Sequence, residues 1–543
     1  MSNEQKNAEN VFKEFKEHSV TEFFRKNRQM LGYSGKVRSL TTAIHEYVTN
    51  SLDACEEAGI MPEIYLKIQQ NGEERYIITV RDNAIGIPKK IIGKALASVL
   101  SGTKFHRYVQ QRGQQGIGAA GCTLFAQITT GKGIHAKSYT DSEAFECDIS
   151  LDIKNNKPII ENVAKLENPT NMHGLEVTAE FAGVKYEKSV HGVYEYVKRT
   201  AMVNPHASLT LLDPEGKEYV FPRSVEELPK KAKQAKPHPL GLEAADLLDF
   251  AHASTSNKVS TFFSESFSRF GPAKIDEMKT LIPELDFDKE PRNITWNESE
   301  AIVNAIKKMK WVSPETDSIS EIGDAGIEAA IRNILNPEFV SVVQRKPKVF
   351  KGGIPFLVEI GIAYGGAAGR SGEESASMSI LRFANKVPLL FDGGSCAITE
   401  AVRDIAWKRY GINDIDNVPV SILVSICSVY VPYAGVGKQS VAPESEIEDE
   451  IKLAVMDGLR NLQRYLHGMK NKGIAETRYK TIMRYIGQLS EDLGELTGKD
   501  AVTIENSLRN LIETKYKSLF ANSEEEKEEA ASDESQEPEE QEN

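Results

Sequence analysis

The chain has 543 residues, which is too long for one compact core, and its 40% hydrophobic and 27% charged residues exclude a wholly disordered, collagenous or membrane-embedded protein. Its formal net charge is -13, but residues 523–543 carry eleven acidic residues and one lysine and so contribute -10 of that total. The acidity of the chain therefore does not exclude nucleic acid as a partner of its folded part.

The cysteines are odd in number, widely scattered and without a CxxC pair, so the sequence predicts neither a disulfide framework nor a zinc site. They are Cys55, Cys122, Cys147, Cys396 and Cys427. The most apolar stretch, residues 420–433, is interrupted by serines and a proline before it reaches the roughly 18 residues of a membrane span. We expect a cytoplasmic protein that does not enter a membrane.

Helical patterns alternate with short β-rich runs up to about residue 225, which is typical of an α/β layered domain. The clearest β-rich runs are residues 64–69, 76–80 and 174–181. Residues 229–237 then combine four lysines with two prolines and no apolar periodicity, so we expect an exposed linker and a domain boundary there.

The helical pattern over residues 40–58 carries three polar side chains on one face. Glu46, Asn50 and Asp53 lie at positions i, i+4 and i+7, within an arc of about 60°. The opposite face is apolar and consists of Ile44, Val48, Leu52 and Cys55. The polar row can hold a hydrated Mg²⁺ and orient a water molecule for attack, although a solvated amphipathic helix explains the same pattern.

An acidic residue and a glycine follow the β-rich run 76–80. Asp82 stands at the expected strand end, and Gly86 comes four residues later, where a planar group can approach the backbone. A carboxylate in this position is suited to recognise the exocyclic amine of a base. An ordinary turn explains the segment equally well.

Residues 111–121 form a glycine-rich segment that can bind an anion, because converging N–H groups and a helix N-terminus favour negative charge. The residues before it are too polar for the buried strand of a dinucleotide-binding fingerprint. Gly437 and Lys438 lack the rest of a Walker P-loop.

The second half of the chain begins with mostly helical patterns over residues 239–310. A second α/β domain is expected from residue 322, with a helix over 326–335 and strands over 356–363, 378–383 and 420–431. Helical periodicity returns over residues 448–520, and residues 523–543 are expected to remain disordered because they contain no core-forming side chain.

The order of these motifs resembles the GHKL ATPase superfamily, which includes gyrase, the ninety-kilodalton heat-shock chaperone, histidine kinases and the mismatch-repair ATPase. This resemblance implies a Bergerat-type α/β sandwich that binds ATP and Mg²⁺. His173, Gly174 and Leu175 resemble the last ATP-site strand of that superfamily. Ala84 and Leu175 depart from the glycine and threonine that are usual there.

Further segments resemble the B subunits of archaeal type IIB DNA topoisomerase VI, over residues 18–520. They are residues 22–28, 110–118, 382–390 and 431–440. The resemblance implies an α+β multidomain fold. Its expected parts are a GHKL ATPase domain with an N-terminal strap (1–228), a helix-two-turn-helix domain with a basic linker (229–317), a ribosomal-protein-like α/β transducer (318–490), a C-terminal helical extension (491–522) and an acidic tail (523–543).

The same resemblance assigns roles to individual residues. Glu46 is expected to be the general base, Asn50 the Mg²⁺ ligand and Asp82 the acceptor for the adenine amine, while Gly86 lets the ring approach and Lys438 reaches the γ-phosphate. The residues expected to bind the phosphates are Ser101, Gly102, Thr103, Lys104, Gly113, Gln114, Gln115, Gly116, Ile117 and Gly118.

None of the 18 tyrosines stands in a constellation suited to DNA cleavage, so we expect this chain to cut nothing by itself. The resemblance implies that a separate A subunit cleaves DNA, that the two chains form an A₂B₂ assembly, and that two B subunits dimerise on ATP around a DNA duplex. Candidate DNA contacts are the basic groups Lys230, Lys231, Lys233 and Lys236; Lys307, Lys308 and Lys310; and Arg345, Lys346, Lys348 and Lys351. The resemblance also implies a partner-docking surface over residues 464–496, which includes Tyr479, Met483 and Ile486.

Two other functions fit the same patterns. One is an ATP-driven clamp of the chaperone or mismatch-repair kind that has no DNA-cleaving partner. The other is a DNA-binding scaffold with a degenerate ATP site, which the departures at Ala84 and Leu175 suggest.

Overall fold

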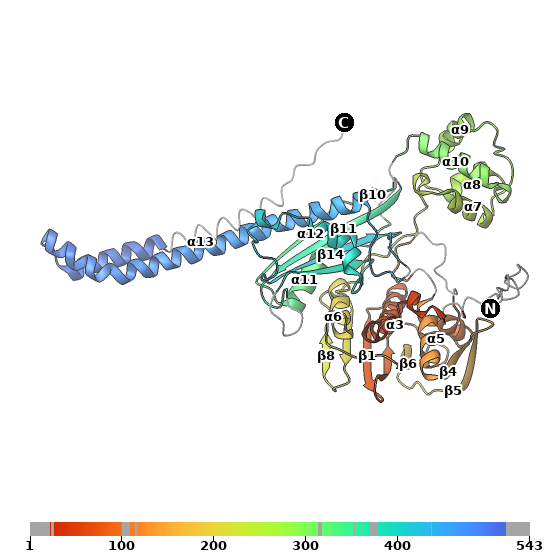
Figure 1. Ribbon diagram of the computed structural model, residues 1–543, viewed down its shortest axis with the longest axis horizontal. Helices are drawn as coiled ribbons and strands as arrows, with labels where there is room; N and C mark the ends of the chain where they lie inside the picture. The colour runs from red at the N-terminus through yellow and green to blue at the C-terminus, as the bar shows by residue number, and fades with distance from the viewer. Residues whose placement is uncertain are drawn as a thin grey trace, which may run out of the picture. The chain divides into compact units, whose positions relative to one another are not determined.

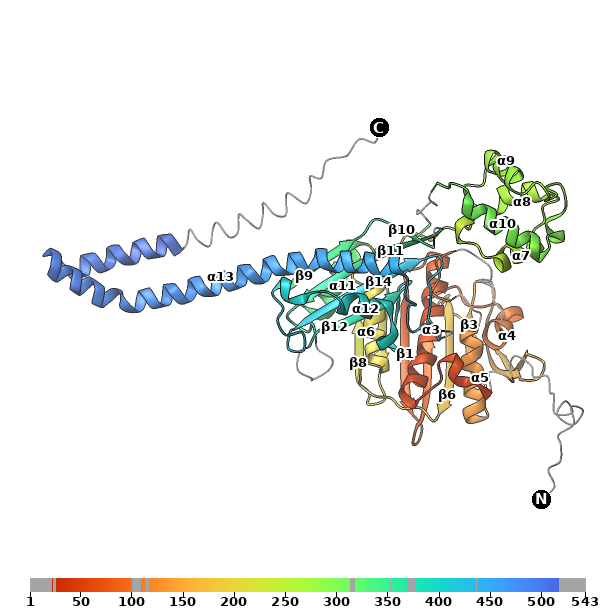
Figure 2. The same cartoon turned by 45° about the horizontal axis from the view of Figure 1, so that its top comes forward.

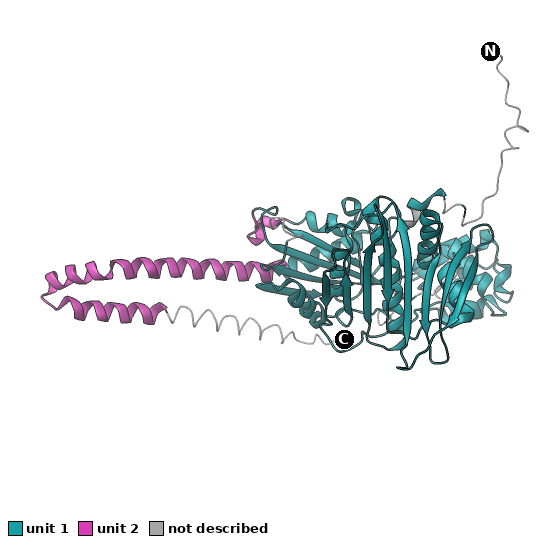
Figure 3. Ribbon diagram, turned by 90° about the horizontal axis from the view of Figure 1, so that it is seen from below, with its two compact units in different colours: residues 1–405, 414–458 teal, residues 406–413, 459–543 magenta. Residues whose placement is uncertain are grey.

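The computed structural model describes residue 22 and residues 26–99, 109–113, 117–312, 318–351, 353–369, 377–435 and 437–516. Seven predicted phosphate-binding residues lie outside these ranges, namely Ser101, Gly102, Thr103, Lys104, Gln114, Gln115 and Gly116. The chain divides into two compact units, residues 1–405 with 414–458, and residues 406–413 with 459–543 (Figure 3).

An eight-stranded, mostly antiparallel sheet forms the first part of the first unit, with the strand order β5-β4-β3-β6-β2-β1-β7-β8 (Figure 1). The strands are β1 (Glu63–Gln70), β2 (Arg75–Arg81), β3 (Ile134–Tyr139), β4 (Ala144–Asp152), β5 (Lys157–Lys165), β6 (Gly174–Ala182), β7 (Ser208–Leu212) and β8 (Glu218–Phe221). Buried and partly exposed residues alternate along β1, β2 and β3, as expected for a sheet that packs on its core through one face.

Four helices pack against this sheet (Figure 2). They are α3 (Lys36–Ala58), α4 (Lys89–Ala97), α5 (Gly118–Thr130) and α6 (Val193–Val203). The apolar face of α3 is central to the core, since Ile44, Val48, Leu52 and Cys55 are each at most 2% exposed. The helix ends at Gly59, whose φ of 76° is a conformation that glycine adopts without strain.

A smaller helical cluster follows the lysine-rich linker. It contains α7 (Ala244–Ala253), α8 (Val259–Ser266), α9 (Pro272–Leu281) and α10 (Trp296–Lys308). Four phenylalanines, Phe262, Phe263, Phe267 and Phe270, are buried in its core and contact one another through their rings. Thr295 and Glu298 form a reciprocal capping box that fixes the start of α10.

A second sheet has the strand order β10-β11-β14-β12-β13, with β9 also paired to β11. Its strands are β9 (Phe339–Gln344), β10 (Lys348–Phe350), β11 (Ile354–Tyr364), β12 (Ser379–Ala384), β13 (Val387–Pro388) and β14 (Val420–Ser428), and its short helices are α11 (Asp324–Leu335) and α12 (Ala397–Arg403). Nearly every residue of β11 and β14 is buried, so both faces of this sheet are covered.

Two glycines allow helices to approach this second sheet closely. A Cβ on Gly361 in β11 would lie 2.4 Å from the side chain of Ile331 in α11. A Cβ on Gly458 in the long helix α13 (Ser445–Thr497) would lie 2.8 Å from the side chain of Ile362. The sheet is therefore packed between α11 and the first part of α13.

Ion pairs also fix the start of α13 against β9 and β10. Arg345 Nε lies 2.7 Å from Glu450, and Lys348 Nζ lies 2.6 Å from the same carboxylate. Lys351 Nζ lies 2.8 Å from Glu444. Three of the four cations in the third predicted DNA-contact group are thus paired within the protein, which gives their charges a structural role.

The second unit contains the remainder of α13 and a helical segment over residues 501–516. The chain reverses at Gly498, whose φ is 69°, and Asp500 accepts a hydrogen bond from the Thr503 N–H at the start of the returning segment. The rings of Tyr479 and Tyr516 lie 4.3 Å apart, so the two helical segments form a hairpin. No helix in the described part of the chain has the length and hydropathy of a membrane span.

Candidate active site

Helix α3 supplies the polar face of the candidate site. Its buried apolar face fixes its rotation, which leaves Glu46 partly exposed and Asn50 exposed. Asp53, the third residue of the predicted polar row, is instead 7% exposed and paired with Arg112. The first two residues of the row can therefore reach a ligand, whereas Asp53 supports the protein framework.

Asp82 lies directly after β2 and is held by three hydrogen bonds. Ser51 Oγ in α3 donates to Asp82 Oδ2 at 2.8 Å, and the main-chain N–H groups of Ala84 and Leu175 each donate to Oδ1 at 3.1 Å. Burial raises the pKa of Asp82, and these hydrogen bonds oppose that rise. The carboxylate is thus fixed in orientation between α3, β2 and the start of β6.

The two departures from the superfamily pattern leave these contacts intact. Ala84 and Leu175 both act on Asp82 through their main-chain N–H groups, so neither hydrogen bond depends on the identity of the side chain. The residue before Leu175 has to be glycine, because a Cβ on Gly174 would lie 2.1 Å from the carbonyl oxygen of Asp82.

Gly86 is required by its own backbone surroundings. Its φ is 70°, and a Cβ would lie 2.3 Å from the carbonyl oxygen of Tyr139 at the end of β3. The sequence had suggested that this glycine leaves room for a planar ring. The close approach in the structure is to main-chain atoms, and the contact with a ring stays a prediction.

The carboxylate of Glu46 lies at the N-terminus of α5. A Cβ on Gly118, the first residue of that helix, would lie 1.9 Å from Glu46 Oε2, so any larger residue there would force the Glu46 carboxylate to move. The first N–H groups of a helix lack partners within it and carry partial positive charge, which favours an anion at this position. Gly118 of the predicted glycine-rich segment is therefore in contact with Glu46, the predicted general base.

Arg112 lies inside the glycine-rich segment 111–121, but no role was predicted for it from the sequence. Its guanidinium lies 2.8 Å from Asp53 and 2.6 Å from Glu56, both in α3. Burial disfavours the charged forms of Arg112 and Glu56. The two acids nevertheless raise the pKa of Arg112, and Arg112 together with His206 holds the pKa of Glu56 well below its usual range. These buried ion pairs fasten the segment 109–113 to α3.

Lys438 lies in the loop between β14 and α13, in a left-handed conformation with a φ of 50°. Burial lowers the pKa of Lys438, while the negative charges of Glu46 and Asp53 oppose that shift. Lys438 also contributes to lowering the pKa of His45, the neighbour of Glu46. A Cβ on Gly437, the residue before Lys438, would lie 3.9 Å from the guanidinium of Arg38 in α3, so this loop of the second domain lies beside that helix.

The position of this loop is fixed by its neighbours. Arg382 in β12 donates to the carbonyl oxygens of Leu389 and Phe391 at 2.8 Å and to that of Gln439 at 3.4 Å. Arg38 at the start of α3 forms two hydrogen bonds with Asp392, at 3.0 and 2.9 Å. The residue after Lys438 is therefore tied to the same segment that contacts α3.

The described residues fit a nucleotide with a divalent cation. Among them no group of three or more histidine, cysteine or acidic residues is arranged to hold a metal ion, but Mg²⁺ commonly takes one or two protein ligands and completes its shell with water and phosphate. Asn50 offers an exposed amide oxygen one turn from Glu46. The site combines a buried acceptor, a partly exposed carboxylate at a helix N-terminus and a lysine from a second domain.

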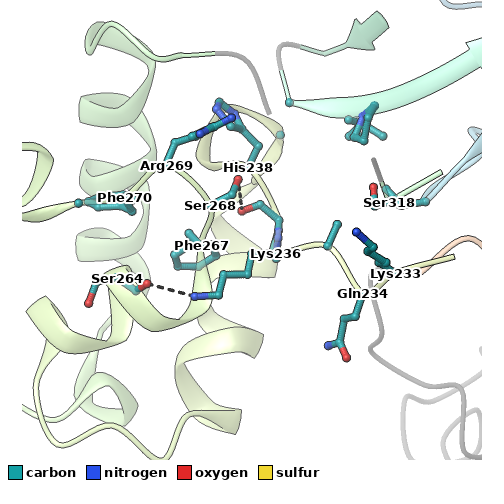
Figure 4. Close-up of a pocket in the computed structure, with 18 residues that line it drawn as sticks. Lys233, Gln234, Lys236, His238, Ser264, Phe267, Ser268, Arg269, Phe270 and Ser318 are labelled. Atoms are coloured by element: carbon teal, nitrogen blue, oxygen red, sulfur yellow. Dashed lines mark hydrogen bonds between the residues drawn. The ribbon is translucent and has the colours of Figure 1, made fainter. Parts of the chain in front are cut away.

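A separate cleft lies between the lysine-rich linker, the helical cluster and the start of β11 (Figure 4). Lys233, Lys236 and Arg269 line it, and Lys236 Nζ donates to the carbonyl oxygen of Ser264 at 3.4 Å. This cleft shares no residue with the site on α3.

Comparison with protein-family profiles defines the class of this site. Residues 35–154 match the histidine kinase-, DNA gyrase B- and HSP90-like ATPase family, and residues 314–478 match the topoisomerase VI B subunit transducer. The first match contains Glu46, Asn50, Asp82 and Gly118, and the second contains Lys438. The chain is an ATPase of the GHKL type that carries a transducer domain.

Similar proteins then identify the family. The chain is 44% identical to the type 2 DNA topoisomerase 6 B subunit of Thermococcus sibiricus over 557 residues, which cover 94% of this chain and 97% of that protein. The proteins of the same name from Pyrococcus horikoshii and Methanothermobacter thermautotrophicus are 44% and 42% identical, covering 94% and 92% of this chain and 97% and 95% of their own lengths. The chain belongs to the family of type 2 DNA topoisomerase 6 B subunits, and its function is that of the ATP-driven B subunit of a type IIB topoisomerase.

Proposed function

We propose that this chain binds ATP with Mg²⁺ on the polar face of α3 and hydrolyses it to drive a DNA clamp. Asp82 accepts a hydrogen bond from the adenine amine. Asn50 would hold the cation, which would neutralise part of the phosphate charge. Glu46 polarises the attacking water and accepts its proton. Gly113 and Gly118 present main-chain N–H groups to the phosphates, and Lys438 offsets the charge that develops on the γ-phosphate.

The observation that carries this proposal is the position of the Lys438 loop beside α3: a Cβ on Gly437 would lie 3.9 Å from the guanidinium of Arg38 in that helix. A lysine from the second sheet that acts on the same phosphate as α3 makes the docking of the two domains depend on the nucleotide. Two B subunits would then dimerise on ATP and enclose one DNA duplex. In this scheme an A subunit cleaves a second duplex within an A₂B₂ assembly, and hydrolysis resets the clamp after strand passage.

The test of this function uses the full chain with and without the A subunit. We expect ATP-dependent relaxation of supercoiled plasmid when both subunits are present, and no relaxation or nicking by this chain alone. A non-hydrolysable ATP analogue is expected to convert the chain from monomer to dimer in light scattering. Plasmid nicking by this chain alone would contradict the proposed division of labour, and ATP turnover indistinguishable from zero would contradict the proposed ATPase.

For the A subunit, we propose a docking surface on α13. The expected surface, residues 464–496, falls on the part of this helix that belongs to the second unit. Of the residues expected there, Ile486 is buried and the ring of Tyr479 contacts that of Tyr516, so other side chains form the exposed face. Ile482, Tyr485 and Leu489 are 46%, 62% and 46% exposed there and follow one another at helical spacing. Such an apolar row on an otherwise polar helix is suited to bind a partner protein.

For DNA, we propose contacts through Lys307, Lys308 and Lys310 at the end of α10. All three are exposed, and within the described residues none of them takes part in an ion pair. Replacing all three by glutamine is expected to weaken binding of the full chain to any duplex. The salt dependence of binding is expected to become shallower by roughly one in slope for each phosphate that the variant no longer neutralises. Fluorescence anisotropy over a salt series would measure both effects.

A matched control replaces three exposed lysines at the far edge of the first sheet, Lys154, Lys157 and Lys165. It removes the same charge from the same unit. An equal loss of affinity in the control would mean that net charge alone, and not the α10 surface, determines binding.

A further inference from the structure

The strands β12 and β13 are joined by a buried turn, Asn385–Lys386. Both residues have a positive φ, 48° and 63°, as hairpin turns that match the twist of their strands require. Hairpin turns usually face water, but Asn385 and Lys386 are only 2% and 5% exposed. The turn of the second sheet is inserted against the first domain, beside the segment that leads into the glycine-rich motif.

The side-chain amide of Asn385 connects two parts of the candidate site. Its Nδ2 donates to the carbonyl oxygen of Gln111 at 3.2 Å and to that of Ser428 at 2.9 Å, and its Oδ1 accepts from the Ser428 N–H at 2.9 Å. Gln111 immediately precedes Arg112 and Gly113. Ser428 ends β14, the strand that continues into the Lys438 loop.

Neighbouring residues fix the same junction from both sides. Lys386 Nζ donates to Ser320 Oγ at 2.8 Å, and the carbonyl oxygen of Lys386 accepts from Asn204 at 3.1 Å. The side chain of Gln110 forms two hydrogen bonds with the main chain of Ser320, at 2.9 and 2.7 Å. Asn204 in turn accepts a hydrogen bond from Arg112. Each of the three residues before Gly113 is therefore held by a partner from outside its own segment.

We propose that Asn385 is a positioning residue for ATP hydrolysis, because its amide fixes the main chain at Gln111 relative to the end of β14. It thereby sets Gly113 and Lys438 at the spacing that a bound triphosphate requires. This inference rests on the proposed ATPase function. Asn385 does not reach the nucleotide, and the adenine acceptor Asp82 does not depend on it.

The substitution Asn385→Gly tests this role. Glycine adopts a φ of 48° without steric cost, so the variant loses the amide while the turn is preserved. We expect kcat for ATP to fall about tenfold or more, with the affinity for ADP measured by calorimetry within about twofold of the wild type. Asn385→Asp is expected to show the same loss, because it places an oxygen opposite two carbonyl oxygens.

The matched control is Asn336→Gly. Asn336 also has a positive φ, 42°, but it is exposed at the end of α11, and within the described residues its side chain makes no hydrogen bond. We expect this variant to turn over ATP as the wild type does, and all variants to show cooperative thermal unfolding without nucleotide.

Equal kcat in Asn385→Gly and Asn336→Gly would overturn the inference and leave the proposed function intact. A parallel loss of ADP affinity would also overturn it, since that result would indicate general damage to the domain. Absence of turnover in the wild type would overturn the proposed function and the inference together.

Discussion

Replacing Glu46 by glutamine is expected to lower kcat for ATP hydrolysis by about 10²- to 10⁴-fold while nucleotide binding remains. The side chain of Glu46 packs closely against Gly118, since a Cβ on that glycine would lie 1.9 Å from Glu46 Oε2. Glutamine has the same shape as glutamate and therefore fits in the same space. It cannot accept the proton of the attacking water. Because the adenine acceptor Asp82 and its three hydrogen bonds are unchanged, the affinity for ATP is expected to stay within a few-fold.

Single-turnover hydrolysis and titration calorimetry would separate these two quantities. The control is Glu57→Gln, which changes an exposed glutamate on the same helix α3 and is expected to have no effect on either. In the proposed cycle the Glu46→Gln variant also stays dimeric after it binds ATP, because dimerisation needs binding and not hydrolysis. Equal and negligible turnover in the wild type and the variant would favour the DNA-binding scaffold over the ATPase.

The elements that the sequence predicted well are those with strong local patterns. The expected runs 64–69, 76–80 and 174–181 correspond to β1, β2 and β6, and the helix expected over 40–58 begins four residues earlier as α3. The other five strands of the first sheet were not named individually from the sequence. The two at its ends illustrate why, since β5 is largely exposed and β8 has only four residues, so neither shows a hydrophobic alternation that periodicity could detect.

Those residues of the candidate site that stand in short sequence motifs could be predicted. Glu46, Asp82 and Gly118 lie in three segments whose order along the chain resembles the GHKL ATPases, and their contact with a nucleotide stays a prediction. The network around Arg112 and Asn385 was not predictable, because each hydrogen bond joins residues far apart in sequence, such as Gln111 with Asn385. Asparagine is common in turns because it tolerates a positive φ, so the sequence gives no reason to expect a further role for Asn385. Only its tertiary hydrogen bonds show that its side chain connects two segments.

The predicted basic clusters also show what the sequence leaves open, because the partners of their charges are distant along the chain. Runs of lysine and arginine indicate basic surface, but sequence alone cannot say which charges have internal partners. The structure pairs Arg345 and Lys348 with Glu450 across more than one hundred residues, whereas Lys307 and Lys308 remain exposed at a helix end. The DNA hypothesis is therefore best tested on α10.

Replacing Lys438 by methionine is expected to lower kcat by about 10²- to 10³-fold, because it removes a partly buried charge that faces the γ-phosphate in the proposed site. Methionine keeps much of the apolar stem, so the loop held by Arg382 should keep its conformation. The control is Lys346→Met, which changes an exposed lysine of the same domain and is expected to leave turnover unchanged. Turnover within about twofold of the wild type in Lys438→Met would contradict the role of this lysine.

The pH profile gives this prediction a second, independent readout. Burial lowers the pKa of Lys438, so as the pH rises its ammonium loses its proton earlier than an ordinary lysine does, and the alkaline limb of kcat/KM is expected at a correspondingly lower pH. Glu46 and Asp53 oppose the shift but do not reverse it. Lys438→Arg keeps the charge at every accessible pH but not the compact geometry, so it is expected to be slower at neutral pH and to lack that alkaline limb. An alkaline limb at the same pH in Lys438→Arg and in the wild type would assign the titration to another group and separate the charge of Lys438 from catalysis.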